Sequence, residues 1–171
     1  MKKTLFILVT SLFAMSAQAQ DNFLSGFVNA CEHSDSYRNF QKDLCKPVIG
    51  KDDFERCELG KITLPANIAS LVKTHKLTDH TEHTLFQVKL KPGLEFAKNK
   101  IISLEQWTGH SNGIWGTALV VDTKDIKSVN QKIKQSGLKI KTLKDTDIGD
   151  VGMTVDKGDD GYVRLICDMS N

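Results

Sequence analysis

Two apolar runs separated by a short polar turn form the most regular pattern in the chain, IISLEQWTGHSNGIWGTALVVD over residues 101–122. Both runs are rich in β-branched and aromatic residues, and the turn, Thr108–Gly113, is polar and contains two glycines, which is typical of a β-hairpin. The second run, Ile114–Val121, is apolar at successive positions, as in a strand that is covered on both sides. We therefore predict that this hairpin forms the middle of a sheet.

Helical periodicity dominates the chain before the hairpin. Asp21–Cys31 and Ser36–Cys45 carry apolar residues at intervals of three or four, and Pro47 follows the second segment. These two segments predict an α-helical hairpin. A third helix is predicted at Pro65–Thr74, where the proline suits the first helical position. A further helical turn is predicted within Asp52–Cys57.

Alternation with a period of two marks the strands that flank the central hairpin. One precedes it at His83–Leu90, and a helix follows it at Asp122–Ser136, with Asp122 as the expected cap and Gly137 as the expected stop. Another strand is expected over Leu138–Leu143. A last hairpin is expected from Val151–Val155 and Tyr162–Cys167.

Strands that occur in runs, with few helices between them, indicate an α+β fold with a mainly antiparallel sheet. We predict five or six strands in the order β-β-β-α-β-β-β. The helical hairpin and the third helix precede the sheet, and one helix packs on it. The length suits a single α+β domain over residues 20–171.

The first 19 residues have the pattern of a secretory signal peptide. Lys2 and Lys3 precede a short apolar run, and Ala17-Gln18-Ala19 matches a cleavage site before Gln20. The apolar run is too short for a permanent membrane span, and no later stretch is long enough. This pattern is typical of a bacterial signal peptide, so we expect a periplasmic or secreted protein.

Processing removes the apparent basicity of the chain. The full sequence has 23 Lys plus Arg and 21 Asp plus Glu, and loss of Lys2 and Lys3 leaves 21 of each. A formally neutral chain gives no electrostatic argument for a nucleic-acid partner.

Four cysteines, Cys31, Cys45, Cys57 and Cys167, lie in the mature chain. An even number in an exported protein predicts two disulfides, with three pairings open. Because three cysteines lie in the helical N-terminal part, at least one disulfide is expected to join that part to the sheet. Our first choice of pairing is Cys31–Cys45 with Cys57–Cys167.

Three of the five histidines, His75, His80 and His83, fall within nine residues and carry imidazole groups that zinc or copper prefers. Their spacing is not that of a metalloprotease helix and crosses an expected helix end, loop and strand start. A solvated polar loop explains the same residues, so a metal site here is the alternative hypothesis. No other cofactor is predicted.

The tip of the central hairpin is the first candidate binding surface. Trp107 and Trp115 flank the turn at matching distances, and Thr108, His110 and Asn112 lie in or beside it. The tryptophans suit either cross-strand packing or an exposed aromatic pair of the kind that interfaces use. The His110-Ser111 sequence lacks the orienting acid and the nucleophile elbow of a hydrolase, so no catalytic residue is assigned.

A lysine-rich segment that begins at Lys124 and Lys127 is the second candidate surface. Lysines between the apolar positions of an amphipathic helix usually form its solvated face, and they also suit an acidic partner. The tip and this helix are expected to share one edge of the sheet.

No nucleotide-binding, zinc-finger or paired-carboxylate motif is present. An exported, disulfide-linked chain without catalytic motifs favours a non-enzymatic protein that binds another macromolecule, most concretely an inhibitor or immunity protein for a secreted hydrolase or toxin. The alternative is a small extracytoplasmic enzyme or metal-binding protein that uses the three histidines. A structural protein of the cell envelope is a third hypothesis.

Overall fold

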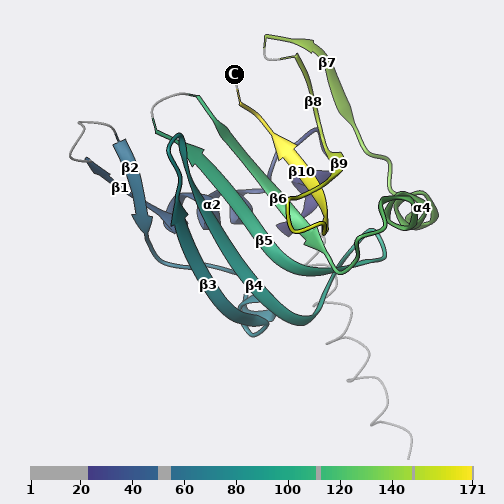
Figure 1. Cartoon of the computed structure of the whole chain (residues 1–171). Coiled ribbons are helices and arrows are strands. Elements are labelled where there is room, and N and C mark those ends of the chain that lie inside the picture. Colours follow the sequence, from purple (N-terminus) through teal and green to yellow (C-terminus); the bar gives the residue numbers. More distant parts are fainter. Residues whose placement is uncertain (1–22, 50–54, 111–112, 148, 171) are drawn as a thin grey trace, which may run out of the picture.

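The computed structural model (Figure 1) describes residues 23–49, 55–110, 113–147 and 149–170. The expected signal peptide lies outside the described residues. In chain order the elements are the 3-10 turn η1 (Ser25–Phe27), α2 (Asp35–Leu44), β1 (Cys45–Ile49), β2 (Glu55–Leu59), α3 (Ala66–Ala69), β3 (Val72–Asp79), β4 (His83–Phe96), β5 (Asn99–Gly109), β6 (Trp115–Val121), α4 (Ile126–Ser136), β7 (Thr142–Thr146), β8 (Gly149–Gly152), β9 (Thr154–Lys157) and β10 (Val163–Asp168).

A six-stranded antiparallel sheet in the order β3-β4-β5-β6-β10-β9 organises the molecule. The central β5–β6 hairpin is confirmed. The last hairpin is confirmed with a shifted first strand, because Val151 belongs to β8 and β9 runs from Thr154 to Lys157. The sheet has the predicted number of strands, but its members differ from the prediction. The edge strand β3 joins it, whereas β7 pairs with β8 in a separate two-stranded arm.

The third predicted helix is largely wrong. Only Ala66–Ala69 is helical, and the chain from Val72 onward pairs with β4 as an edge strand. Val72, Thr74 and Thr78 are β-branched, so their side chains suit the pleated surface of a sheet. Apolar residues at helical spacing over the first half of the segment had concealed this strand.

The N-terminal helical hairpin is reduced to one helix. Within the described residues the first segment forms only η1, while α2 is capped by Ser34, whose hydroxyl accepts a hydrogen bond from the Tyr37 amide. The predicted helical turn before Cys57 is also wrong over residues 55–57, which belong to β2. The remainder of that segment lies outside the described residues.

The helix between β6 and β7 is confirmed with a shifted start. Asp125, not Asp122, caps α4 and accepts hydrogen bonds from the amides of Lys127 and Ser128. Gly137 ends the helix with a φ of 74°, a left-handed conformation that glycine adopts without a steric penalty.

Two disulfides are present, and the pairing we favoured is wrong. Cys31 bonds to Cys167 and Cys45 bonds to Cys57. The second bond is local because β1 and β2 form a hairpin that the sequence reading missed. The expected link between the N-terminal part and the sheet is confirmed, since Cys31–Cys167 joins residues 136 positions apart. Closing a loop of that length stabilises the fold by roughly 4–5 kcal/mol in the chain-entropy model.

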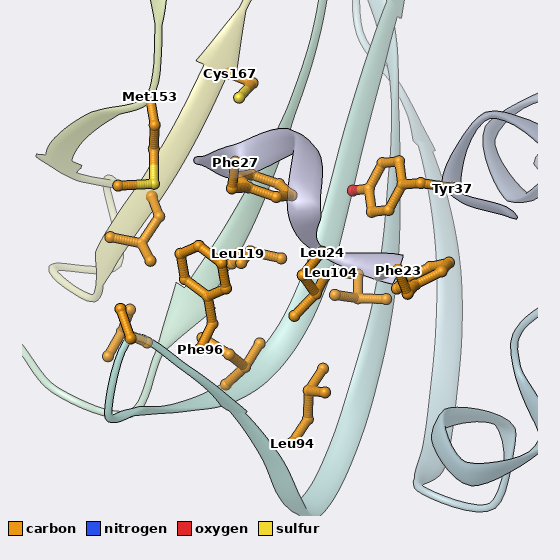
Figure 2. Packing of buried hydrophobic residues seen from close by; sticks show 14 of the residues in the cluster. Phe23, Leu24, Phe27, Tyr37, Leu94, Phe96, Leu104, Leu119, Met153 and Cys167 are labelled. Atoms are coloured by element: carbon orange, nitrogen blue, oxygen red, sulfur yellow. The ribbon is translucent and has the colours of Figure 1, made fainter. Parts of the chain in front are cut away.

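The hydrophobic core lies between one face of the sheet and the helical segments. Figure 2 shows Leu24 and Phe27 lying against Leu104 and Leu119 of the two central strands. Helix α4 contributes its buried residues to the same cluster. None of the helices in the described part of the chain is long and apolar enough to cross a membrane.

Candidate functional site

The two faces of the sheet have different surroundings. On the covered face, alternate residues such as Phe86, Leu104 and Leu119 point into the core cluster. Figure 1 shows α2 behind the sheet, on the side away from the viewer. On the open face, the intervening residues, among them Glu105 and Trp107, point the other way, and each described helix places its buried residues on the covered side.

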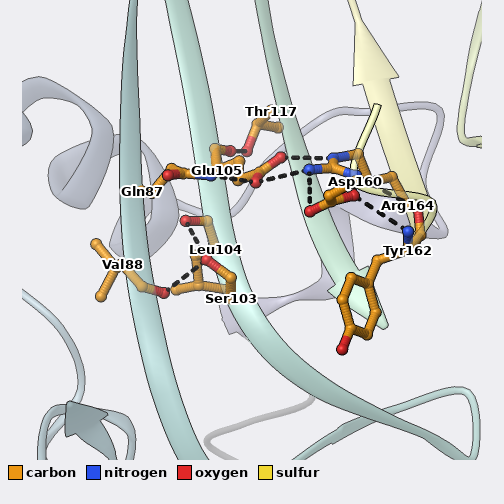
Figure 3. Close-up of polar contacts among 9 residues, drawn as sticks. All are labelled: Gln87, Val88, Ser103, Leu104, Glu105, Thr117, Asp160, Tyr162 and Arg164. Atoms are coloured by element: carbon orange, nitrogen blue, oxygen red, sulfur yellow. Dashed lines mark hydrogen bonds and ion pairs between the residues drawn. The ribbon is translucent and has the colours of Figure 1, made fainter. Parts of the chain in front are cut away.

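A charged network occupies the middle of the open face (Figure 3). Arg164 of β10 donates two hydrogen bonds to Glu105 of β5, at 2.7 Å and 3.1 Å, and Gln87 of β4 donates another to Glu105 at 2.8 Å. Arg164 also donates to Asp160 at 2.8 Å and 3.3 Å and to the Tyr162 carbonyl at 3.3 Å. These five bonds account for every N–H of the guanidinium.

The ion pairs shift the titration of their members. Burial alone would lower the pKa of the Arg164 guanidinium, but its bonds with Asp160 and Glu105 outweigh burial and raise that pKa. The hydrogen bond from Arg164 in turn lowers the pKa of the Asp160 carboxyl. With all its protons committed, Arg164 holds β5, β10 and the β9–β10 turn together and has no donor left for a ligand.

The β9–β10 turn folds over this half of the open face. The Gly158 backbone lies so close to Arg164 that a Cβ atom on the glycine would be 1.7 Å from Nη1. The Lys124 ammonium lies 5.2 Å from the centre of the Tyr162 ring, a cation–π contact that holds the turn from the other side. The β9–β10 turn therefore closes the half of the open face that contains Glu105 and Arg164.

Trp107 lies on the other half of the open face, which remains accessible and also contains Leu85 and Gly116. A Cβ atom on Gly116 would lie 2.2, 2.4 and 2.7 Å from three atoms of the Trp107 indole, Cζ2, Cε2 and Nε1. These distances place the edge of the indole formed by Nε1, Cε2 and Cζ2 against the Gly116 backbone. The side chain is half-buried. A glycine inside a strand permits this close approach.

The neighbours of the indole follow from the strand register. Leu85 of β4 lies directly opposite Trp107, and Asp168 of β10 lies directly opposite Gly116. We define the Trp107 surface as Thr78, Leu85, Gln87, Trp107, Ile166 and Asp168. It combines an aromatic and two aliphatic side chains with a polar margin, which is the composition of an interface hot spot and its surroundings.

The two tryptophans do not form a pair. Trp107 lies opposite Gly116, while Trp115 lies opposite Thr108, so the two indoles point to opposite faces of the sheet. Trp115 lies on the covered face, with its ring centre 6.4 Å from that of His33. The sequence left open cross-strand packing or an exposed aromatic pair, and neither arrangement describes both residues. Trp107 lies on the open face, whereas Trp115 lies on the covered face.

His110 is a buried attachment point for the hairpin tip. Its Nε2 lies 3.0 Å from Asp79 Oδ1 and 3.1 Å from Thr84 Oγ1, and its Nδ1 lies 3.3 Å from the Thr81 carbonyl oxygen. Because both ring nitrogens already face oxygen atoms, this His–Asp pair leaves no nitrogen for a substrate proton. Ser111 and Asn112 lie outside the described residues.

Asp79 joins the hairpin tip to β2 as well. Arg56 Nη1 donates to Asp79 Oδ2 at 2.7 Å, and the Thr84 hydroxyl donates to Asp79 Oδ1 at 3.1 Å. Slight burial raises the pKa of the Asp79 carboxyl, but the hydrogen bonds and the positive charge of Arg56 have the larger combined effect and lower it. The cluster therefore fixes the ends of β3, β4 and β5 to one another.

The predicted binding residues fall into separated groups. The hairpin tip and the lysines of α4 lie at opposite ends of β6, a seven-residue strand about 20 Å long. Their expected position on one shared edge is wrong. Lys124 contacts Tyr162, and Lys127 is exposed in the first turn of α4. Of the predicted residues that the structure describes, only Trp107 belongs to the accessible half of the open face.

The three clustered histidines do not converge. His80 and His83 stack with ring centres 4.6 Å apart at the β3–β4 turn, but His75 pairs with Val88, five residues along β4 from His83. That separation corresponds to about 17 Å. Burial and the positive charges of His80 and His110 lower the pKa of His83. No group of three or more metal-ligating side chains occurs within the described ranges.

Sequence analysis missed Leu85, Glu105, Gly116 and Arg164. Two of them carried a signal: Gly116 interrupts an apolar strand, which marks a close approach, and Glu105 is a charge within a buried strand, which requires a partner. The identity of that partner depends on the pairing of β10 with β6, which the sequence does not reveal.

Searches against protein-family models, curated proteins and solved structures find no significant match.

Proposed function

We propose that the mature chain is an exported, non-enzymatic protein that binds another protein through the Trp107 surface. The most concrete version is an inhibitor or immunity protein for a secreted hydrolase or toxin. The observation that supports this proposal is the half-buried indole of Trp107, which packs on Gly116 and shares the open face with Leu85 and Ile166. A preformed aromatic loses little conformational entropy when a partner covers it.

Two further features support the same function. The disulfides Cys31–Cys167 and Cys45–Cys57 suit an oxidising compartment outside the cytoplasm. The polar groups with the geometry of a catalytic site, Asp79 with His110 and Glu105 with Arg164, are saturated by contacts within the chain. Their arrangement is that of structural links between strands.

The experiment is a capture of partners from periplasmic extract by the tagged mature protein, followed by affinity measurement with each purified partner. Trp107→Ala should weaken a specific complex about 30-fold or more, which is the effect of removing a hot-spot residue. Leu138→Ala is the matched control, because Leu138 is 44% exposed and follows α4, outside the Trp107 surface. Equal binding by wild type and the Trp107 variant would refute the proposed surface. Metal analysis of the untagged protein tests the histidine alternative in the same preparation.

A further inference from the structure

A pocket of about 500 Å³ lies beside the Cys31–Cys167 disulfide, between the N-terminal segment and the β7–β8 arm. Cys31, Val151 and Met169 form part of its apolar lining, and Leu143 of β7 forms one wall. Val151 and Cys31 are buried, whereas Leu143 is 55% exposed. An exposed leucine beside a preformed apolar hollow is a place where a ligand would remove apolar surface from water.

Two carboxylates, Glu32 and Asp147, also line the pocket, and both residues are exposed. Glu32 accepts a hydrogen bond from Asn29 Nδ2 at 2.9 Å. Within the described residues neither carboxylate forms an ion pair with a lysine or arginine. Lys141 donates to Asn29 Oδ1, on the same amide group that donates to Glu32, so this cation lies near Glu32 without contacting it, whereas Lys144 pairs with Asp150. The residues that line the pocket are mainly apolar, with two carboxylates and no cationic side chain among them.

We propose that this pocket receives a lysine or arginine side chain of a partner protein. Such a side chain has an aliphatic stem that fits the apolar lining and a cationic head that reaches the two carboxylates. Charge complementarity selects this occupant over an acidic or a purely aliphatic one. The assignment of the side chain to a partner rests on the proposed function, and it adds that the partner presents a basic residue.

The position of the pocket is compatible with one partner covering both surfaces. Asp168 belongs to the Trp107 surface on the open face, and the next residue, Met169, lines the pocket. The two sites therefore meet at the C-terminal end of β10, which Figure 1 shows beside the β7–β8 arm. A partner that stacks on Trp107 has a basic side chain within reach of Glu32 if its surface wraps around the end of this strand.

Peptide titration tests the pocket without the natural partner. The probes are three capped tripeptides, Ala-Lys-Ala, Ala-Arg-Ala and Ala-norleucine-Ala, where norleucine keeps the stem of lysine but lacks the amine. Amide shifts of the isotopically labelled mature protein are followed by NMR. We expect saturable shifts at Leu143, Val151 and Met169 with the two basic peptides, weaker binding of the norleucine peptide, and weaker binding of the basic peptides at higher salt.

The variants separate charge from fold. The double variant Glu32→Gln and Asp147→Asn should weaken binding of the basic peptides about tenfold and leave the norleucine peptide unchanged. Asp159→Asn is the matched control, since it removes an exposed carboxylate in the β9–β10 turn. Equal binding of the lysine and norleucine peptides would refute the cationic ligand, and shifts elsewhere or none would refute the pocket. Failure to capture any partner would instead refute the proposed function, whatever the peptides do.

Discussion

Alternate residues of β5 serve two different environments. Leu104 enters a core of aromatic and aliphatic side chains on the covered face, whereas Glu105 and Trp107 lie on the open face among a saturated ion-pair network and an accessible indole. The covered face is stabilised by burial of apolar area, which tolerates loss of volume poorly. The open face is held instead by hydrogen bonds, by one buried ion pair and by one close backbone contact.

The largest expected effect is on the covered face. Phe27→Ala should lower the free energy of unfolding by about 3–5 kcal/mol, because Phe27 is fully buried and its ring contacts the rings of Tyr37 and Phe96. Leu85→Ala on the open face should lower it by about 1 kcal/mol or less, since Leu85 is only half-buried. Urea unfolding of both variants measures the contrast. Similar losses would mean that the open face carries as much of the packing energy as the covered one.

The ion-pair network gives the next largest effect. Arg164→Leu should destabilise the protein by about 3 kcal/mol, because it leaves the buried Glu105 carboxylate without its charge partner. The double variant Glu105→Leu and Arg164→Leu should lose less than the single variant, since no buried charge remains unpaired. The comparison pair is Lys144 with Asp150, an exposed ion pair whose removal should leave the stability nearly unchanged because solvent screens it.

A greater loss in the double variant than in the single one would contradict this account of the network. It would mean that Glu105 and Arg164 each contribute independent stabilising contacts. The measurement is equilibrium unfolding of the wild type, Glu105→Leu, Arg164→Leu and the double variant, with Lys144→Leu as the control.

The covered face contains a buried imidazole among its apolar side chains. His33 is buried, stacks on Tyr37 with ring centres 4.3 Å apart, and has no hydrogen-bond partner for either ring nitrogen within the described residues. Burial, followed by the positive charge of Arg38, lowers the pKa of His33 to about 4. The folded protein therefore keeps this imidazole neutral.

This pKa predicts a pH dependence of stability. Between the ordinary histidine pKa of about 6.5 and the lowered value, the unfolded chain binds a proton that the folded chain does not, so stability falls as the pH falls through this window, by about 3 kcal/mol in total. His33→Leu should flatten the curve between pH 6.5 and pH 4. His83 shifts in the same direction, so the measurement is the difference between the curves of wild type and variant. Parallel curves would show that His33 does not cause the loss.

The sequence was informative where the pattern was local and regular. The central hairpin, the stop of α4 at Gly137 and the β9–β10 hairpin each depend on residues close together in the chain, so periodicity and turn chemistry were sufficient. The short β1 and β2 strands and the edge strand β3 were missed or read as helix. Each of them is short or partly polar, and tertiary pairing overrides a weak local preference.

The candidate site was harder to predict than the fold because it depends on register. Trp107 was identified from its type and its place beside a turn, but a shift of one residue decides which face a side chain occupies. The observed register places Trp107 and Trp115 on opposite faces of the sheet, and it places Glu105 directly opposite Gln87. The predicted disulfide pairing was wrong for a related reason, since the choice of partner for Cys31 depends on where β10 lies in the sheet.

The smallest effect concerns the contact that makes Trp107 accessible. Gly116→Ala places a Cβ atom within 2.2 Å of the indole, so the ring must move off the sheet, at a cost of about 1–2 kcal/mol. In a Trp115→Phe background the fluorescence of Trp107 should shift to longer wavelength as the ring gains contact with water. Gly137→Ala is the matched control: it has a similar cost because of its positive φ, but no atom lies near the added methyl group. Unchanged emission in the Gly116 variant would mean that the indole does not rest on this backbone, and the distinction between the accessible and closed halves of the open face would lose its physical basis.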